Sequence, residues 1–392
     1  MNDKKILFVT LNNYPEGDAG AVRQHAMAKV FIENGYKVYV IGCGHENNKE
    51  FKDYDGVSYI SLKPTGNIFK RKFESFMFAS KVSQLIEKKF ENNLSAIIVV
   101  NGLPNLFNRI RKYAIKKDIP IVYDAVEWYS PEEYKAGKFA IPYIINNSIN
   151  KYIIRKPWKI IAISSYLENY FRKKGLETTR IPVIMECNNK TELNMKKEAQ
   201  KKIFMYAGSP GTGKKDYLDL VFNAFAKLDE KYKNNYEFHI FGITEQQLIE
   251  KCLVDIDIIK KLENNLFLHG RVKRTEIQKW LKKAHYTVLI RKSEQRYAMA
   301  GFPTKSVESL MNGVPIVCNY SSDLNMYLFD KINSIIVEDT CVESIVKAIE
   351  RAIILDQNQY NEMQSNAFDT FKNNFEPKRY SSKLLNLVKN NK

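Results

Sequence analysis

The feature that most constrains the fold is a repeated alternation between short strand patterns and amphipathic helical patterns. In the first half of the chain, strand patterns occupy residues 5–11, 37–43, 57–62, 94–100, 120–125, 158–164 and 179–185. Amphipathic stretches at 21–34, 69–90 and 105–117 separate several of them. Such alternation predicts a parallel sheet with helices on both faces.

A polar connection at residues 186–202 interrupts this alternation, as is typical of the chain between two domains. Strand patterns then resume at 203–208, 236–242, 265–270, 286–290, 315–319 and 334–337, with helical patterns at 217–228, 245–262, 275–284, 304–312 and 342–355. A length of 392 residues agrees with two domains. We therefore expect an α/β protein of two tandem doubly wound domains, 1–188 and 202–375, facing across a cleft. The helical stretch 376–392 is expected to cross back to the first domain.

Composition and charge exclude several classes of protein. No apolar run approaches the roughly 18 residues that span a bilayer, and the start of the chain does not resemble a signal peptide. Five cysteines without a Cys-x-x-Cys pair favour neither a disulfide framework nor a zinc site. We expect a cytoplasmic protein. Its net charge of +17 favours polyanions in general, although a lysine-rich proteome would produce the same excess.

The densest motif follows the strand pattern that ends at residue 290. A polar loop leads to Gly301, after which Phe302, Pro303 and Thr304 open a helix that Gly313 closes. Free N–H groups and a partial positive charge at the start of a helix favour a bound phosphate. The motif therefore indicates a nucleotide-diphosphate site in outline, with a plain loop-to-helix junction as the alternative.

Gly-Phe-Pro-x-x-x-x-Glu at 301–308, followed by Gly-Val-Pro-Ile-Val at 313–317, resembles the signature of glycosyltransferase family 4. This family, also described as glycosyl transferases group 1, contains retaining sugar-nucleotide transferases with two Rossmann-like domains, the GT-B fold. Segments along the whole chain follow the family's order, at 14–21, 122–128, 163–165, 180–182, 205–208, 268–271 and 286–290.

The resemblance implies transfer of a sugar from a nucleotide-diphosphate donor to a glycan or lipid-linked oligosaccharide, as in surface polysaccharide synthesis, without a metal or other cofactor. It assigns the charge on the leaving diphosphate to Lys305, Arg291 and either Lys214 or Lys215, and the ribose hydroxyls to Glu308. The other implied donor residues are Gly20, Gly208, Ser209, Gly301, Phe302, Pro303 and Thr304. The implied acceptor-side residues are Asp124, Glu127 and His25.

Three positions depart from the family pattern. The first glutamate of its Glu-x7-Glu motif is Ala300, so a contact to the donor sugar is missing or comes from elsewhere. The arginine that usually follows the glycine at 208 is Ser209, and Arg291, Arg296 or Arg271 would have to compensate. A histidine common near the fifth strand is replaced by Val126.

Other motifs leave two further functions open. Gly208-x4-Gly213-Lys214 has the spacing of a P-loop NTPase, but Lys215 replaces the Ser or Thr that would hold Mg²⁺. Loss of the first glutamate also permits a non-catalytic protein that binds nucleotide or glycan. Asp255-Ile-Asp257 imitates a metal motif, yet its apolar neighbours predict the exposed face of a helix.

The stretch Phe69–Ala79 combines three consecutive basic residues with phenylalanines, as in a helix at a membrane interface. It would place the protein peripherally on the anionic inner face of the membrane. A helix that packs on its own sheet explains the pattern equally well. We expect no nucleic-acid partner.

Overall fold

The computed structural model describes residues 4–15, 17, 19–44, 47, 50–62, 68–90, 93–187, 193, 195, 200–209 and 215–389. The chain forms two compact units. The first comprises Met1–Tyr129, Ile141–Glu186 and Glu376–Lys392, and the second comprises Ser130–Ala140 and Cys187–Phe375. The sequence analysis places residues 130–140 in the first domain. The structure packs them with the second, because Glu133 pairs with Lys215 and Ser130 bonds to Tyr297.

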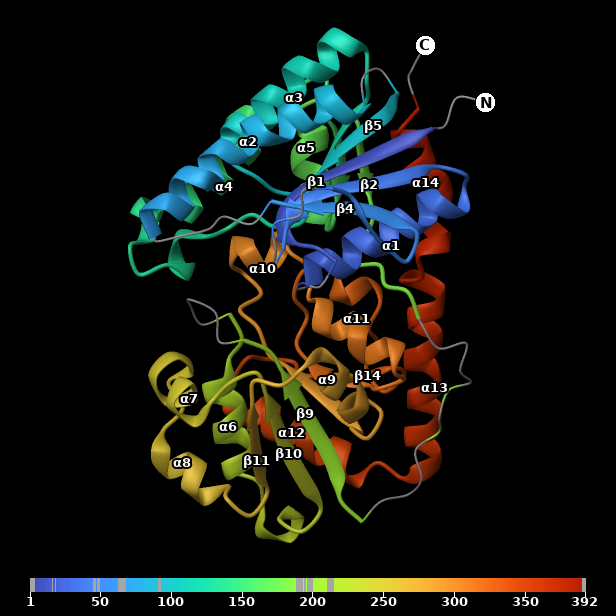
Figure 1. Ribbon diagram of the computed structural model, residues 1–392. Coiled ribbons are helices and arrows are strands. Elements are labelled where there is room, and N and C mark those ends of the chain that lie inside the picture. Colours follow the sequence, from blue (N-terminus) through green and yellow to red (C-terminus); the bar gives the residue numbers. More distant parts are fainter. Residues whose placement is uncertain are drawn as a thin grey trace. The chain divides into compact units, whose positions relative to one another are not determined.

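The first unit contains an eight-stranded sheet in the order β3-β4-β2-β1-β5-β6-β7-β8 (Figure 1). Its strands are β1 (Lys5–Asn13), β2 (Lys37–Cys43), β3 (Lys52–Tyr54), β4 (Val57–Ser61), β5 (Leu94–Val99), β6 (Ile121–Ala125), β7 (Lys159–Ala162) and β8 (Thr178–Arg180). All neighbours are parallel except the β3–β4 hairpin, which the sequence analysis does not predict.

Helices cover both faces of this sheet. They are α1 (Ala19–Glu33), α2 (Ile68–Phe90), α3 (Pro104–Lys117), α4 (Ile141–Ser148), α5 (Ser165–Lys173) and α14 (Ser381–Leu387). Phe31 of α1 and Leu384 of α14 share a core with Val122 of β6. Tyr123 points to the opposite face because side chains alternate along a strand, and there it meets Phe107 of α3.

The second unit contains a six-stranded parallel sheet in the order β11-β10-β9-β12-β13-β14. Its strands are β9 (Lys202–Ala207), β10 (Tyr236–Phe241), β11 (Leu266–Gly270), β12 (Tyr286–Leu289), β13 (Ile316–Cys318) and β14 (Ser334–Ile336). Its helices are α6 (Leu218–Ala226), α7 (Glu245–Cys252), α8 (Ile256–Lys261), α9 (Arg274–Leu281), α10 (Arg296–Ala300), α11 (Thr304–Met311), α12 (Val342–Ile354) and α13 (Gln357–Asn374). Two tandem parallel α/β units confirm the predicted fold class.

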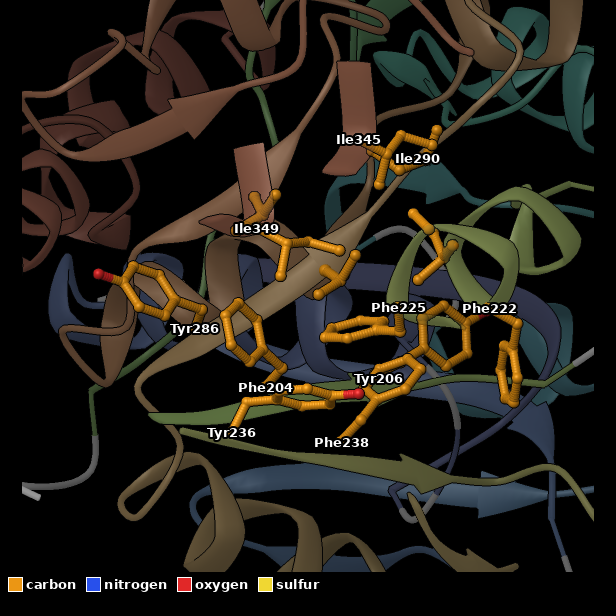
Figure 2. Close-up of a cluster of buried hydrophobic side chains, with 14 of the residues drawn as sticks. Phe204, Tyr206, Phe222, Phe225, Tyr236, Phe238, Tyr286, Ile290, Ile345 and Ile349 are labelled. Carbon is orange, nitrogen blue, oxygen red and sulfur yellow. The ribbon is translucent and has the colours of Figure 1, made fainter. Parts of the chain in front are cut away.

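An aromatic core fixes β9 and β10 against α6 and α12 (Figure 2). Phe225 of α6 stacks on Phe238 of β10 with ring centroids 4.3 Å apart, and Phe204 of β9 stacks on Tyr286 of β12 at 5.4 Å. Offset stacking of this kind adds to the free energy gained by burying apolar area. The strand ends that carry the site therefore start from a rigid base.

Three elements differ from the sequence prediction. The expected helix 245–262 is two helices, because Leu253 adopts a left-handed conformation (φ 56°) and the Asp255 carboxylate caps α8 by accepting from the Asp257 N–H at 2.9 Å. The strand expected at 179–185 ends at Arg180, close to Pro182, which cannot donate to a ladder. The loop before Gly301 contains α10.

Within the part of the chain that the structure describes, no helix is both long and apolar enough to cross a membrane.

Candidate active site

The candidate site of the second unit lies where its strand order changes direction. Ligands of open parallel sheets bind beyond the carboxyl ends of the strands at such a point. Here β9 has β10 on one side and β12 on the other. Gly208 directly follows β9, and Arg291 follows β12 after Ile290. The predicted donor residues Gly208 and Arg291 thus occupy adjacent strand ends.

A carboxylate that the sequence analysis does not identify holds this site together. Asp216 Oδ1 accepts a hydrogen bond from Arg291 Nε at 2.7 Å, and its Oδ2 accepts from Lys305 Nζ at 2.6 Å. The backbones of Asp216 and Arg291 also form an antiparallel bridge. Three residues far apart in the chain thereby form one partly buried charge cluster, with two cations on one anion. We call Asp216, Arg291 and Lys305 the Asp216 cluster.

Tyr206 connects the Asp216 cluster to the aromatic core. Its ring lies in the core of Figure 2, and its hydroxyl donates to Asp216 Oδ2 at 2.7 Å. Lys305 Nζ is 2.8 Å from the same hydroxyl and 4.1 Å from the ring centroid. The Lys305 ammonium therefore has a hydrogen-bond acceptor and an aromatic face that hold it in position.

Gly208 leaves room for the close approach of Lys305. A β-carbon at position 208 would collide with the Lys305 ammonium and lie 2.7 Å from the Tyr206 hydroxyl. A β-carbon at Gly242, whose φ is +87°, would collide with the Gly208 carbonyl. A side chain at residue 208 would therefore displace the Lys305 ammonium, and glycine keeps the backbone of this strand end accessible to the cluster.

Burial and charge act against each other in the Asp216 cluster. Burial alone raises the pKa of Asp216, but Arg291 and Lys305 outweigh it and hold this pKa well below its usual range. Burial lowers the pKa of Lys305, and Asp216 offsets part of that decrease. Burial also opposes the charge on Arg291, yet Asp216 raises its pKa above the ordinary value. Asp216 thus favours the charged forms of both Arg291 and Lys305, and the cluster sets two basic side chains against one carboxylate.

Lys215 lies beside the cluster and is paired separately. Its ammonium is 3.0 Å from the Glu133 carboxylate, and its carbonyl accepts from the Tyr297 hydroxyl at 3.0 Å. Glu133 is buried and also accepts from the Ser130 N–H at 2.7 Å, which closes a short helical turn. The Lys215 side chain is 37% exposed, so this cation remains accessible despite its partner.

Helix α11 places the predicted motif residues. It begins at Thr304 after Pro303, and no side chain caps its N-terminus. Phe302 is buried between Tyr327 and Phe375 and anchors the loop from Gly301. Thr304 precedes Lys305 at the first turn, so the helix start and the Lys305 ammonium lie at the same end of α11.

Glu308 lies one turn further along α11 and forms an ion pair with Arg274 at 3.1 Å. Burial raises the pKa of Glu308, although Arg274 and Lys305 counteract part of the increase. A pocket next to Glu308 and Lys305 is lined by Ala207, Ser306 and apolar side chains that include Ile277 and Leu281. The pocket combines an apolar wall with a carboxylate and an ammonium, which suits a ligand with polar and apolar parts.

The predicted acceptor-side residues of the first unit do not form a cluster like the Asp216 cluster. Asp124 is completely buried and paired with Arg23 at 2.9 Å, which indicates a structural role instead of the expected contact with an acceptor. His25 contacts the Tyr14 hydroxyl at 2.8 Å and Asp55 at 3.1 Å. Glu127 is exposed, and Gly20 lies in the first turn of α1.

The positions that depart from the family pattern differ in exposure. Ala300 is completely buried at the end of α10 and offers no functional group. Ser209 is exposed after β9. The predicted Lys214 lies outside the described residues. Among the cations considered as replacements for the usual arginine at 209, Arg291 is the one held in the Asp216 cluster.

The sequence analysis misses Asp216, Tyr206, Arg274 and Glu133. Its only signal for Asp216 was the position directly after Lys215, at the start of a helix. Ion pairs between residues 75 and 89 positions apart leave no local pattern in the sequence, and Tyr206 has the same appearance as any core residue of β9.

Comparison with known proteins agrees with this geometry. Residues 190–370 match the family model described as glycosyl transferases group 1. Among solved structures, sucrose-phosphate synthase from Thermosynechococcus elongatus has a TM-score of 0.73 at 12% identity, with 98% of each chain covered. WaaG, a glycosyltransferase involved in lipopolysaccharide biosynthesis, has a TM-score of 0.69 at 14% identity, with 97% of this chain and 99% of that chain covered.

Anabaena HepE, solved in complex with UDP and glucose, has a TM-score of 0.67 at 14% identity and covers 98% of this chain and 99% of its own. No curated protein matches the sequence significantly. At such identities the structural matches establish a shared fold, the GT-B architecture of glycosyltransferases. The match to the family model covers residues 190–370, a little under half of the chain, and lies on the unit that carries the Asp216 cluster.

Proposed function

We propose that the chain is a retaining glycosyltransferase that moves a hexosyl or related sugar from a nucleotide-diphosphate donor to a glycan or lipid-linked oligosaccharide. The observation that carries this proposal is the Asp216 cluster, which lies in the region that matches the family and places two cations on one buried carboxylate. The UDP and glucose bound to HepE support a nucleotide sugar as the donor. The role of WaaG in lipopolysaccharide biosynthesis supports a surface polysaccharide as the product.

Lys305 and Arg291 would act on the leaving group. When the bond to the sugar breaks, negative charge grows on the diphosphate, and fixed positive charges in a partly dry site lower the barrier. Asp216 holds both cations in place before the donor arrives, so little reorganisation is needed at the moment of reaction. Lys215, which is half-exposed, and the start of α11 would contribute further positive potential.

Glu308 would accept hydrogen bonds from the ribose hydroxyls, while the apolar wall with Ile277 and Leu281 would face the base. Arg274 would hold the Glu308 carboxylate in position through their ion pair. In a retaining reaction of this kind the leaving phosphate takes the acceptor proton, so the protein need not supply a general base. The two protein cations would also take the place of a metal ion and of any other cofactor.

The membrane expectation for Phe69–Ala79 is a separate part of this proposal. The side chains at 69–73 lie outside the described residues. Phe76 is 57% exposed, whereas Phe78 and Ala79 are buried. A lipid-linked acceptor would explain why the first unit carries the basic and aromatic residues of Phe69–Ala79, which are typical of a helix at a membrane interface.

A non-catalytic binding protein is the second candidate, because the buried methyl group of Ala300 replaces the first motif glutamate. A P-loop NTPase is a weaker third, since Lys215 pairs with Glu133 where Mg²⁺ would need a hydroxyl ligand.

Nucleotide sugars should be screened by thermal stabilisation, because a ligand at 100 times its dissociation constant stabilises by about 2.7 kcal/mol. The hit is then assayed for hydrolysis and for transfer to membrane extracts, with and without Mg²⁺. Transfer with retention supports the enzyme. Tight binding without hydrolysis or transfer supports the binding protein, and phosphate release from ATP or GTP that depends on Mg²⁺ supports the NTPase.

A further inference from the structure

An ordinary surface helix turns its apolar side toward the protein core. The short helix α4 of the first unit has the opposite orientation. Its polar side faces the protein: Asn147 Oδ1 accepts from the Trp128 indole N–H at 3.1 Å, and Asn146 Oδ1 accepts from the Tyr129 N–H at 2.9 Å. Its apolar side faces solvent, with Ile141 64% and Ile144 48% exposed. No residue of α4 is buried.

The exposed apolar side chains continue on neighbouring elements. The helical turn Ile149–Ile153, which follows α4 directly, carries Tyr152 at 69% exposure. The turn packs on α3, where Ile115 is 54% exposed. The guanidinium of Arg111 on α3 donates to the Lys156 carbonyl at 3.1 and 3.0 Å, which fixes the two segments together. We call residues 104–117 and 141–157 the α3–α4 surface.

Charge on the α3–α4 surface has a single sign. The two segments contain eight basic residues and no acidic one, namely Arg109, Arg111, Lys112, Lys116, Lys117, Lys151, Arg155 and Lys156. Seven of these side chains are exposed, and Arg111 is half-buried. The adjacent C-terminal turn of α2 adds Lys88 and Lys89, and its Glu87 lies near Tyr113 of α3.

We infer that the α3–α4 surface docks on an anionic lipid bilayer, with Ile141, Ile144 and Tyr152 at the level of the headgroups and the lysines and arginines on the lipid phosphates. Protruding isoleucines between cations suit an interface that offers both negative charge and hydrocarbon. A second copy of the same surface would be repelled by like charges. This inference does not depend on the chemistry of the second unit.

The test is sedimentation with vesicles of phosphatidylglycerol and phosphatidylcholine, compared with phosphatidylcholine alone, at low and high salt. Each basic residue near an anionic leaflet contributes about fivefold in partitioning, so Lys151→Gln with Arg155→Gln and Lys156→Gln should reduce binding by on the order of a hundredfold. Ile141→Asn with Ile144→Asn should reduce it by about tenfold or more.

Matched controls come from the second unit. Ile332→Asn with Ile354→Asn removes two isoleucines of similar exposure, 52% and 64%, and Lys227→Gln with Lys231→Gln and Lys233→Gln removes three exposed cations. Both control variants should bind the anionic vesicles as the unchanged protein does. Thermal melting and donor binding should stay unchanged in all four variants, which separates this inference from the proposed function.

Equal binding to neutral and anionic vesicles would overturn the inference, as would test variants that bind no worse than the controls. Loss of binding only with Lys70→Gln, Arg71→Gln and Lys72→Gln would move the contact to the start of α2. If Ile141→Asn with Ile144→Asn lowered the melting temperature, the test would depend on the variant of Lys151, Arg155 and Lys156 alone, because those side chains are exposed and their loss should not affect folding. Binding to an acidic protein but to no vesicle would assign the surface to that class of partner.

Discussion

Two buried aspartates, one in each unit, contrast in how their charge is balanced. Asp124 at the end of β6 has one guanidinium partner, Arg23, which also donates to the carbonyls of Ile181 and Pro182. The side chains of this pair are 1% and 3% exposed. Asp216 in the second unit has two cationic partners, and the side chains of Arg291 and Lys305 are 15% and 28% exposed.

The contrast separates a structural ion pair from a binding site. The Arg23–Asp124 pair is neutral and its donors are used by backbone carbonyls, so nothing is left for a ligand. The Asp216 cluster sets two basic side chains against one carboxylate, and both of these side chains are partly accessible. An anion can therefore gain from the second arrangement and not from the first. Burial of an acidic residue alone does not distinguish the two cases.

The largest expected effect is on stability, from Arg23→Met. Removing one partner of a buried ion pair leaves an uncompensated charge, which costs about 3 to 5 kcal/mol. We expect the free energy of unfolding of the first unit to fall by this amount, measured in urea, with donor affinity unchanged in the protein that remains folded. A decrease below about 1 kcal/mol would mean that Asp124 is less isolated than its contacts indicate.

The next effect is on catalysis, from Lys305→Ala. If the Lys305 ammonium acts on charge that develops in the transition state, kcat should fall about a hundredfold or more, while donor affinity falls less. Lys215→Ala should also lower kcat more than donor affinity, but the decrease in kcat should be smaller, because Glu133 already neutralises part of the Lys215 charge. Arg111→Ala in the first unit serves as the control. A change confined to KM would make both lysines simple phosphate binders.

The sequence predicted the architecture well because periodicity and chain order carry it. The strand expected at 37–43 coincides with β2, and the two parallel sheets follow from the alternation alone. It also predicted α11, because Gly-Phe-Pro-Thr is a local start signal. Arg291 was assigned through the family resemblance. The sequence could not predict that Asp216 joins Arg291 to Lys305, since that contact depends on tertiary packing of β9 and β12.

The sequence analysis does not identify α4, and its orientation depends on tertiary contacts in the same way. The asparagines of segment 141–148 accept from the indole N–H of Trp128 and the backbone N–H of Tyr129, and two of its isoleucines face outward. The direction in which a helix faces depends on the partners that its polar residues find.

A smaller effect on donor binding is expected from Glu308→Gln. Loss of charge-assisted hydrogen bonds to the ribose should weaken binding about ten- to a hundredfold. Because burial raises the pKa of Glu308, binding by the unchanged protein should weaken on acidification earlier than an ordinary glutamate would cause. Titration calorimetry across pH should show this dependence lost in Glu308→Gln. Affinity equal to that of the unchanged protein would remove Glu308 from the site.

Asp216→Asn should lower stability by about 1 kcal/mol at neutral pH, since the amide has an acceptor oxygen on one side only and the two cations, which are partly exposed, lose their anion. The pKa of Asp216 is below its unfolded value, so its contribution is complete above about pH 4 and is lost as the pH falls further. Urea unfolding should therefore separate the two proteins at about pH 7 and converge in strong acid. If the two proteins differed in free energy of unfolding by the same amount at every pH, the effect of Asp216→Asn would come from the shape of the side chain and not from its charge.

The smallest expected effect is that of a metal chelator. A metal ion in a transferase offsets charge on the leaving diphosphate, and here Lys305 and Arg291 would already provide that charge at fixed positions. We therefore expect EDTA to leave kcat within about twofold, and added Mg²⁺ to change little beyond its binding to the free donor. The Lys305→Ala variant sharpens this test, because a divalent ion that partly restored its activity would act at the position of the missing ammonium. Abolition of turnover by EDTA in the unchanged protein would show that two cations on one aspartate do not suffice, and the contrast with Asp124 would lose its catalytic meaning.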